Sequence, residues 1–423
     1  MSHQLEDVRT KVERAVAWTT MRTGDKLSKN EWIESVVCDP SNGGQSLMNE
    51  QIKRLHREAP LCDVHIHPSM KMFLLNRNLW RHYWSGSFFN PFSSRSDFRM
   101  LQKGGMKLVW ATHHLVEKQI AQDCWLIRAA LFLTPAYSKI MKGPRIERTL
   151  YIMDRFEREL RRRPQKTELA KSVVDIRRIL QEGKMVFVHA VEGGHVLDGK
   201  IENLDRLAER GVACLTLTHF YKNELVTQVD AIPEDQFIKK LCKFNFRTGG
   251  EPALTEFGKG VLRRMKELRM IVDISHCTPD ARQEIYKEIN AEMPIVATHV
   301  GVHNYNPNVY NLTDDEILEI KKSGGGIGVI FYNYWLHKDN PKNGLETIWK
   351  TMQHIHEVTD TWDHVLIGTD FDGFTDPPND IKTAANLPKV TEMLLSKGLS
   401  ESDIKKILGG NAMRILERGW RSH

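Results

Sequence analysis

Eight short runs rich in Val, Ile, Leu or Thr recur along this chain from residue 61 onward, and helical patterns separate most of them. Each run is of the length expected for a buried strand. The runs occupy residues 61–67, 106–114, 184–192, 212–219, 269–276, 294–299, 325–333 and 364–370. Eight strand-helix units favour an α/β fold of the (β/α)8 or TIM-barrel type over an open doubly wound sheet. No Gly-rich phosphate-binding fingerprint follows the first run, which argues further against a dinucleotide-binding domain.

The segments outside these runs predict the domain organisation. Residues 1–58 are polar and amphipathic, and we expect them to form an N-terminal helical extension. Residues 59–423 then form the barrel domain, because a single barrel with insertions reaches this length. Amphipathic helical patterns lie between the runs at 203–210, 256–268 and 313–323. The stretch 115–182 is long enough for several inserted helices.

The composition is that of a globular protein with a large core. Hydrophobic residues make up 41% of the chain, charged residues 27%, and the net charge is +6. This balance excludes a disordered, collagen-like or disulfide-scaffold protein. Basic and acidic residues alternate over 155–163, which is typical of a solvated helix face rather than of a nucleic-acid surface.

The N-terminal sequence and the cysteines indicate the compartment. The N-terminal residues include no apolar segment of the kind found in secretory signals, and no stretch approaches the ~18 apolar residues that a membrane span needs. The cysteines form no C-x-x-C pair, which fits reduced thiols better than a zinc ribbon or a disulfide frame. They are Cys38, Cys62, Cys124, Cys214, Cys242 and Cys277. We therefore expect a cytoplasmic protein with no membrane and no nucleic-acid partner.

The ends of the runs carry the chemistry. The active site of a TIM barrel lies where the strands end, and the first run ends in His65-Ile66-His67. Residues i and i+2 of a strand point to the same side, so both imidazoles can bind one cation. The other endings with a metal ligand or an acid-base group are Glu192, His219, His276, His299 and Asp370. Six of the eight runs therefore deliver such a group to one rim.

A single histidine at a strand end is more often a core residue than a ligand. We give that structural interpretation, or an indirect role behind the ligands, to His113, His114, His189 and His195. Six coincident endings are harder to explain by packing, because clustered buried imidazoles and carboxylates are costly unless a metal or proton chemistry compensates. The pattern therefore predicts a metal site.

Imidazoles with carboxylates and without thiolates suit Zn²⁺ best, with Mn²⁺, Co²⁺ and Fe²⁺ as alternatives. A carboxylate such as Glu192 can bridge two metals ~3.5–4 Å apart, which predicts two Zn²⁺ per chain. Asp370 would accept the proton of the bridging hydroxide and pass it to the leaving amine. His219 would donate a hydrogen bond to the developing oxyanion.

These motifs resemble the membrane (renal) dipeptidase family, zinc hydrolases within the amidohydrolase superfamily. The resemblance covers the chain from about residue 60 to residue 418, in the family's order. The matching segments are DVHIHP (63–68), VEGGHVLDG (191–199), LTLTHFYKN (215–223), 254–276, PIVATH (294–299), 311–333, HVLIGTDFDG (364–373) and GGNAMRIL (409–416).

The resemblance implies a (β/α)8 barrel with a binuclear zinc centre. It assigns His65 and His67 to one zinc, and His276 and His299 to the other, with a bridging carboxylate between them. That carboxylate is Glu192. Asp370 matches the family's catalytic acid-base residue, and His219 matches its substrate-polarising histidine. The resemblance also suggests a homodimer.

Two positions depart from the family pattern. His67 stands where the family usually carries Asp, which removes one negative charge from the metal site. Tyr310 stands where the family carries an arginine that binds the substrate carboxylate, and tyrosine offers one hydrogen bond but no charge. We predict Tyr310 and Asn333 as substrate-binding residues, together with His219.

The resulting prediction is a binuclear zinc-dependent hydrolase that cleaves a dipeptide or a related small amide by attack of a metal-bound hydroxide. The alternative is an enzyme of the same superfamily with a non-peptide substrate, such as a decarboxylase or a lactam or N-acyl amidase. A binding protein on a decayed barrel ranks last, because all seven proposed positions hold a residue that can coordinate or titrate.

Overall fold

The computed structural model describes residues 40–83, 93–134, 136–232, 239, 242–246, 252–336 and 344–422. The chain divides into two compact units, residues 1–54 and 55–423. Helix α3 (Pro40–Glu58) contains the point of division. Most of the predicted N-terminal extension, residues 1–39, lies outside the described residues, so the extension and its boundary at residue 58 stay predictions.

The second unit contains a barrel of parallel strands. Eight strands follow one another in the order β1, β2, β4, β5, β6, β7, β8 and β9, and each pairs in parallel with the next. A parallel bridge between Ile66 and Phe371 joins the chain beyond β9 to β1 and nearly closes the barrel. The strands are β1 (Leu61–Ile66), β2 (Met106–His114), β4 (Met185–Glu192), β5 (Val212–Thr216), β6 (Ile271–Asp273), β7 (Ile295–Val300), β8 (Gly326–Val329) and β9 (Val365–Ile367). The predicted TIM barrel is confirmed.

One short strand was not predicted. Strand β3 (Thr167–Leu169) pairs with β4 outside the barrel order. Its three residues are too few for a period-two pattern to be recognised in the sequence.

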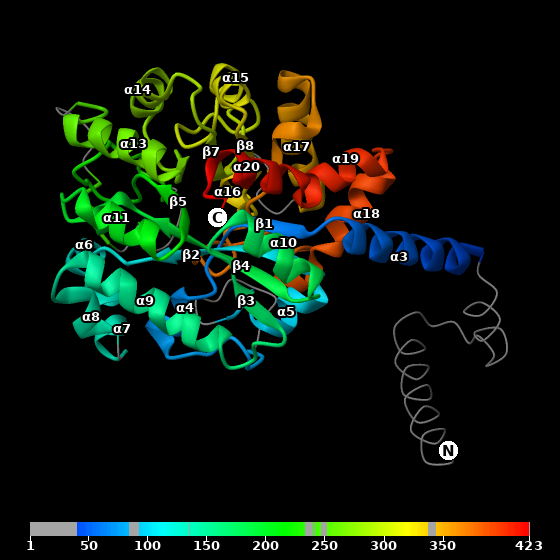
Figure 1. Cartoon of the computed structure of the whole chain (residues 1–423), viewed down its shortest axis with the longest axis horizontal. Coiled ribbons are helices and arrows are strands. Elements are labelled where there is room, and N and C mark those ends of the chain that lie inside the picture. The colour runs from blue at the N-terminus through cyan, green and yellow to red at the C-terminus, as the bar shows by residue number, and fades with distance from the viewer. Residues whose placement is uncertain are drawn as a thin grey trace, which may run out of the picture. The chain divides into compact units, whose positions relative to one another are not determined.

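Helices surround the strands in Figure 1. The helices that follow β1, β2 and the strands from β4 to β9, apart from the insertion between β2 and β4, are α4 (Met70–Leu75), α5 (Phe98–Lys103), α11 (Glu202–Glu209), α13 (Glu256–Leu268), α14 (Pro279–Ile289), α15 (Asp314–Ser323), α16 (Asn333–Leu336), α17 (Leu345–Thr359), α18 (Pro388–Ser396), α19 (Glu401–Lys405) and α20 (Asn411–Gly419). The predicted helices at 203–210, 256–268 and 313–323 correspond to α11, α13 and α15. Helix α15 is preceded by a capping box between Thr313 and Glu316 and is capped at its C-terminal end by Gly324, whose φ is 70°. None of the described helices combines the length and the apolar character that a bilayer crossing requires.

The long stretch between β2 and β4 forms the inserted helices that its length predicted. They are α6 (Lys118–Asp123), α7 (Trp125–Phe132), α8 (Tyr137–Met141), α9 (Arg145–Leu160) and α10 (Val173–Gln181). Helix α9 buries one apolar side, on which Phe156 meets Phe187 of β4 with the ring centroids 5.4 Å apart. Its Arg and Glu residues lie largely on the remaining surface, as the alternating charges predicted.

Strands β2 and β4 show how the fold carries side chains to the rim. Leu108 and Trp110 of β2 pack in one buried cluster with Val186 and Val188 of β4. Because side chains alternate along a strand, the same spacing of two residues continues to His114 on β2 and to Glu192 on β4. The register pairs His114 with Glu192, so the two side chains lie next to each other at the strand ends.

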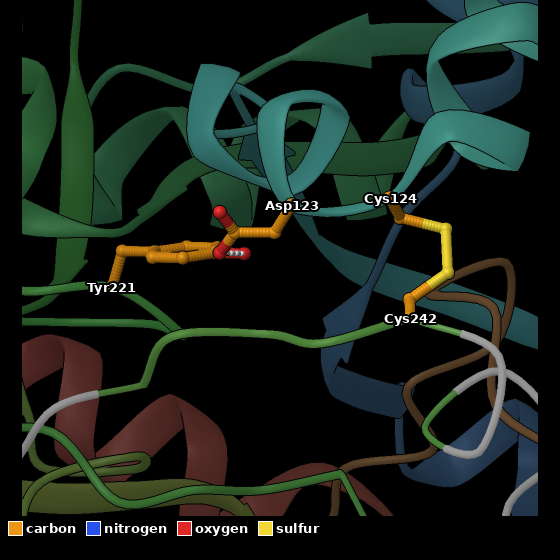
Figure 2. Close-up of a disulfide and its surroundings, with 4 residues drawn as sticks. All are labelled: Asp123, Cys124, Tyr221 and Cys242. Carbon is orange, nitrogen blue, oxygen red and sulfur yellow. Dashed lines mark hydrogen bonds between the residues drawn. A yellow bond between two sulfur atoms is a disulfide. The ribbon is translucent and has the colours of Figure 1, made fainter.

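The cysteines differ from the prediction of reduced thiols. Cys124 and Cys242 form a disulfide although they are 118 residues apart in sequence, beside the hydrogen bond between Tyr221 and Asp123 (Figure 2). The fold brings the residue between α6 and α7 next to the chain that follows β5, and sequence spacing gives no signal of such a pairing. Cys62, Cys214 and Cys277 are free and buried, as expected, and Cys38 lies outside the described residues.

Candidate metal centre

The carboxylate of Glu192 lies at the centre of the predicted site. Its two oxygens face two different sets of imidazole nitrogens at 3.3–3.9 Å, and every ring is buried. The Oε1 group comprises His65 (3.4 Å), His276 (3.3 Å) and His299 (3.4 Å). The Oε2 group comprises His67 (3.6 Å), His114 (3.4 Å) and His219 (3.9 Å). Burial would raise the pKa of Glu192, but the surrounding imidazoles hold it well below the ordinary value, so the carboxylate is charged.

Thr298 fixes the tautomers of two rings in the Oε1 group. Its hydroxyl donates its only proton to Asp273 Oδ2 at 2.6 Å. The Nδ1 atoms of His65 and His299 lie 2.8 and 2.9 Å from the same hydroxyl oxygen, so both must donate to it. Their protons are therefore on Nδ1, and the Nε2 lone pairs point toward the centre of the site. A neutral histidine that binds a metal needs this arrangement.

Asp273 holds Thr298 in place from the end of β6. Its carboxylate accepts five hydrogen bonds, from the hydroxyls of Thr216, Ser275 and Thr298 and from the main-chain N–H groups of Ser275 and Thr298. Asp63 has a similar role within β1, where it accepts hydrogen bonds from the hydroxyl and N–H of Thr369 and from the N–H of His65. Both carboxylates are fully buried. They were not predicted as site residues, although each precedes a candidate ligand by two or three residues.

The arrangement of nitrogens fits a divalent cation. The Nε2 atoms of His65 and His67 are 3.1 Å apart, and those of His276 and His299 are 3.0 Å apart. Nδ1 of His67 and Nδ1 of His276 are buried and have no hydrogen-bond partner among the described residues. Nε2 of His65 and Nε2 of His299 each present a lone pair. A cation bound between the two Nε2 atoms of each pair would therefore separate lone pairs that otherwise meet at close range.

Asp370 lies beside the first of these pairs. Its Oδ1 is 3.1 Å from His67 Nε2, and its N–H donates to the carbonyl of His65 at 2.9 Å. Its backbone is left-handed, with a φ of 57°, as is that of His276, with a φ of 67°. Such strain in non-glycine residues is concentrated at functional sites. Only glycine fits at position 373 next to this carboxylate, because a Cβ on Gly373 would stand 1.9 Å from Asp370 Oδ1.

Glu117 lies behind two rings of the Oε2 group, those of His114 and His219, and was not predicted. Glu117 lies three residues beyond the end of β2, and its Oε1 accepts from His219 Nδ1 at 2.9 Å. Its Oε2 is 3.2 Å from Nε2 of His114. Burial opposes a charge on His114, but Glu117 and Glu192 outweigh it and raise the pKa of the imidazole to about 9. Sequence reasoning missed Glu117, although a search for acidic residues just beyond each predicted strand could have found it.

The two predicted substrate-binding residues outside the imidazole cluster, Tyr310 and Asn333, each donate a hydrogen bond to a main-chain carbonyl. Tyr310 is fully buried, donates from its hydroxyl to the carbonyl of His299 at 3.0 Å, and stacks on Trp335 with the ring centroids 3.6 Å apart. Asn333 donates from Nδ2 to the carbonyl of Pro377 at 3.1 Å, and its buried Oδ1 has no partner among the described residues.

Three of the four histidines that were interpreted as structural have partners other than Glu192. His113 bonds to His189 at 2.7 Å, and His189 Nε2 lies 3.3 Å from Glu157 on α9. His195 Nε2 donates to the carbonyl of Leu115 at 3.0 Å. These contacts agree with the structural interpretation of the three residues, whereas His114 belongs to the site.

Comparison with known proteins identifies the family. The sequence matches the model of the membrane dipeptidase family, peptidase family M19, over residues 49–419. The chain belongs to this family. It is therefore a metal-dependent hydrolase of the dipeptidase class, and the resemblance found in the motifs is confirmed.

Solved structures share the fold of the family member described here. A metallopeptidase of Rhodobacter sphaeroides, crystallised with a phosphinate mimic of the dipeptide L-Ala-D-Ala, aligns with a TM-score of 0.68 and 19% identity over 86% of this chain and 99% of its own. The probable dipeptidase PvdM of Pseudomonas aeruginosa aligns with a TM-score of 0.68 and 18% identity over 88% and 98%. An uncharacterized Klebsiella pneumoniae protein from the pqqA 5′ region is 28% identical over 255 residues, which are 60% of this chain and 89% of that protein.

Proposed function

We propose that this chain binds two divalent cations, preferentially Zn²⁺, and hydrolyses a dipeptide or a related small amide. The observation that carries the proposal is the position of Glu192, a buried carboxylate whose oxygens lie 3.3–3.6 Å from the Nε2 atoms of all four proposed histidine ligands, as expected of a carboxylate between two cations. His65 and His67 would hold one cation with Glu192. His276 and His299 would hold the other.

The chain's own side chains then divide the reaction between them. The bound cations would supply acidified water and polarisation of the scissile carbonyl. Asp370, placed 3.1 Å from His67 Nε2, accepts the proton of the attacking water at its carboxylate and returns it to the leaving amine. His219 faces the space beside Glu192 Oε2 with Nε2, from which it hydrogen-bonds to the carbonyl oxygen of the substrate.

One observation favours a second candidate substrate class. The hydroxyl of Tyr310 is used by the carbonyl of His299, and its side chain is fully buried. The position at which the family's arginine binds a substrate carboxylate therefore supplies no charge in this chain. An N-acyl amide or a lactam, which needs no such charge at that position, is the alternative to a free dipeptide. Substrate binding by Tyr310 and Asn333, a homodimer and a cytoplasmic location stay predictions.

Metal analysis and a substrate screen test the proposal. Elemental analysis of the purified full chain should find about two equivalents of Zn²⁺ or a related dication per chain. The loaded enzyme should hydrolyse at least one member of a panel of dipeptides, N-acyl amino acids and lactams, with one water consumed per bond. A protein that binds no metal contradicts the proposal. Release of CO₂ without incorporation of water would identify a decarboxylase instead.

A further inference from the structure

We infer that Glu117 is a positioning residue that holds the ring of His219 in the orientation needed to meet the substrate carbonyl. The inference rests on the proposed function and deepens it. Glu117 Oε1 accepts from His219 Nδ1 at 2.9 Å and from the N–H of Phe220 at 3.2 Å. The carboxylate therefore binds both the imidazole and the main chain next to it.

The second oxygen of the same carboxylate anchors it to the metal centre. Glu117 Oε2 lies 3.2 Å from Nε2 of His114, and Nδ1 of His114 lies 3.2 Å from the carbonyl oxygen of Glu192. The rings of His114 and His219 are 4.1 Å apart, measured between their centroids. Glu117 thus joins His219 to β2 and β4, whose ends hold His114 and Glu192 in register.

The orientation of His219 depends on this carboxylate. Phe220 packs against the face of the ring, with the centroids 3.8 Å apart, and this packing limits tilting of the ring but does not distinguish Nδ1 from Nε2. The hydrogen bond to Glu117 does distinguish them. It points Nδ1 toward Glu117 and Nε2 toward Glu192, with 3.9 Å between Nε2 and Glu192 Oε2. A ring turned about its Cβ–Cγ bond would lose the bond and aim Nε2 away from the substrate.

The burial of Glu117 supports a role beyond packing. Its side chain is 3% exposed, and a buried carboxylate is costly unless it is paired and hydrogen-bonded. Burial would raise the pKa of Glu117, but His219 and His114 hold it well below the ordinary value. Donation from Nε2 as well as from Nδ1 needs a protonated ring. Burial disfavours that form and lowers the pKa of His219 to about 4, and the anion of Glu117 opposes this effect, as the aspartate of a catalytic triad does for its histidine.

A double-mutant cycle tests the inference. Glu117→Gln keeps the shape of the side chain but removes the negative charge that pairs with the rings of His219 and His114. We expect kcat to fall by about 10–100-fold with little change in KM, and we expect the metal content from elemental analysis to stay at the wild-type value. In the His219→Ala background, Glu117→Gln should lower kcat by less than about twofold, because residues that act through one another are not additive.

Glu157→Gln is the matched control. Glu157 is also a carboxylate beside a buried imidazole, 3.3 Å from His189, but it lies on α9 away from the metal centre. It should change the thermal midpoint and leave kcat within about twofold of wild type. If Glu117→Gln does not fold, Glu117→Asp keeps the charge and shortens the reach, and we expect a partial loss of kcat from that variant.

The outcomes separate this inference from the proposed function. An unchanged kcat in the Glu117 variants, equal losses in both backgrounds, or loss of metal from Glu117→Gln would each overturn the role assigned to Glu117. A wild-type protein that binds no metal or turns over no member of the amide panel would instead overturn the proposed function.

Discussion

Asp273 and Glu117 are buried carboxylates that lie behind the imidazoles of this metal centre, and they support the rings in different ways. Asp273 acts from within the barrel strands, through the hydroxyl of Thr298, and fixes the lone pairs of His65 and His299 toward the centre. Glu117 acts from the loop after β2 and orients His219, which we do not assign to a metal. Asp273 therefore supports histidines that would bind metal, whereas Glu117 supports the histidine that would bind the substrate carbonyl.

The largest effect on metal content and turnover should come from replacing Glu192, which lies next to the imidazoles that Asp273 and Glu117 support. Glu192→Ala removes the carboxylate that faces both the Oε1 and the Oε2 groups. We expect loss of both cations, measured by elemental analysis after dialysis, and loss of detectable turnover. Retention of two metal equivalents would show that the imidazoles bind metal without Glu192 and would remove the basis of the comparison.

Asp370→Asn should separate turnover from metal binding completely. The variant keeps the size of the side chain at a left-handed position next to Gly373 but cannot accept the proton. We expect kcat to fall by about 10²–10⁴-fold, the usual contribution of a general acid-base group, with nearly wild-type metal content. An enzyme that keeps most of its activity would show that Asp370 is not the proton acceptor.

Asp273→Asn tests the support on the strand side. An amide NH₂ in place of Oδ2 would donate to Thr298, whose hydroxyl could then donate to His65 or His299 and move the ring proton to Nε2. Metal affinity should fall by about 10–100-fold in a competitive chelator titration.

Ser275→Ala is the control for the Asp273 variant. It removes one donor to Asp273 and leaves the contact between Asp273 and Thr298 in place. We expect metal affinity close to that of wild type. If Asp273→Asn kept its metal but lost kcat, the strand-side carboxylate would act on turnover and the proposed difference from Glu117 would disappear.

The smallest effect should come from Tyr310→Phe. The substitution removes one hydrogen bond to the carbonyl of His299 and keeps the stacking on Trp335. We expect a loss of about 0.5–1.5 kcal/mol in the free energy of unfolding, from denaturant titration, with unchanged metal content. A large increase in KM would instead show that the hydroxyl reaches the substrate, as the sequence analysis predicted.

The barrel and the central cluster could be predicted from the sequence because they follow from strand periodicity. The eight apolar runs became the eight barrel strands, and the predicted endings converge on Glu192 because parallel strands end at the same rim. Strand length was less predictable. His219, His276 and Asp370 lie three residues beyond the ends of β5, β6 and β9.

The features that the sequence did not reveal depend on tertiary contacts between loops. Glu117 follows a strand whose ending was interpreted as structural, and only the fold shows that His219 comes within 2.9 Å of it. The disulfide between Cys124 and Cys242 likewise joins segments whose proximity no local pattern encodes. Tyr310 is a third example, because its burial behind His299 cannot be inferred from the family position that it occupies.

Anomalous X-ray diffraction from crystals of the metal-loaded enzyme tests the central claim most directly. We expect two anomalous peaks beside Glu192, one between His65 and His67 and the other between His276 and His299. Each peak should lie about 2.0–2.2 Å from its imidazole nitrogens. No peak beside Glu192, or peaks bound by other residues, would contradict the assignment of this cluster as the metal centre.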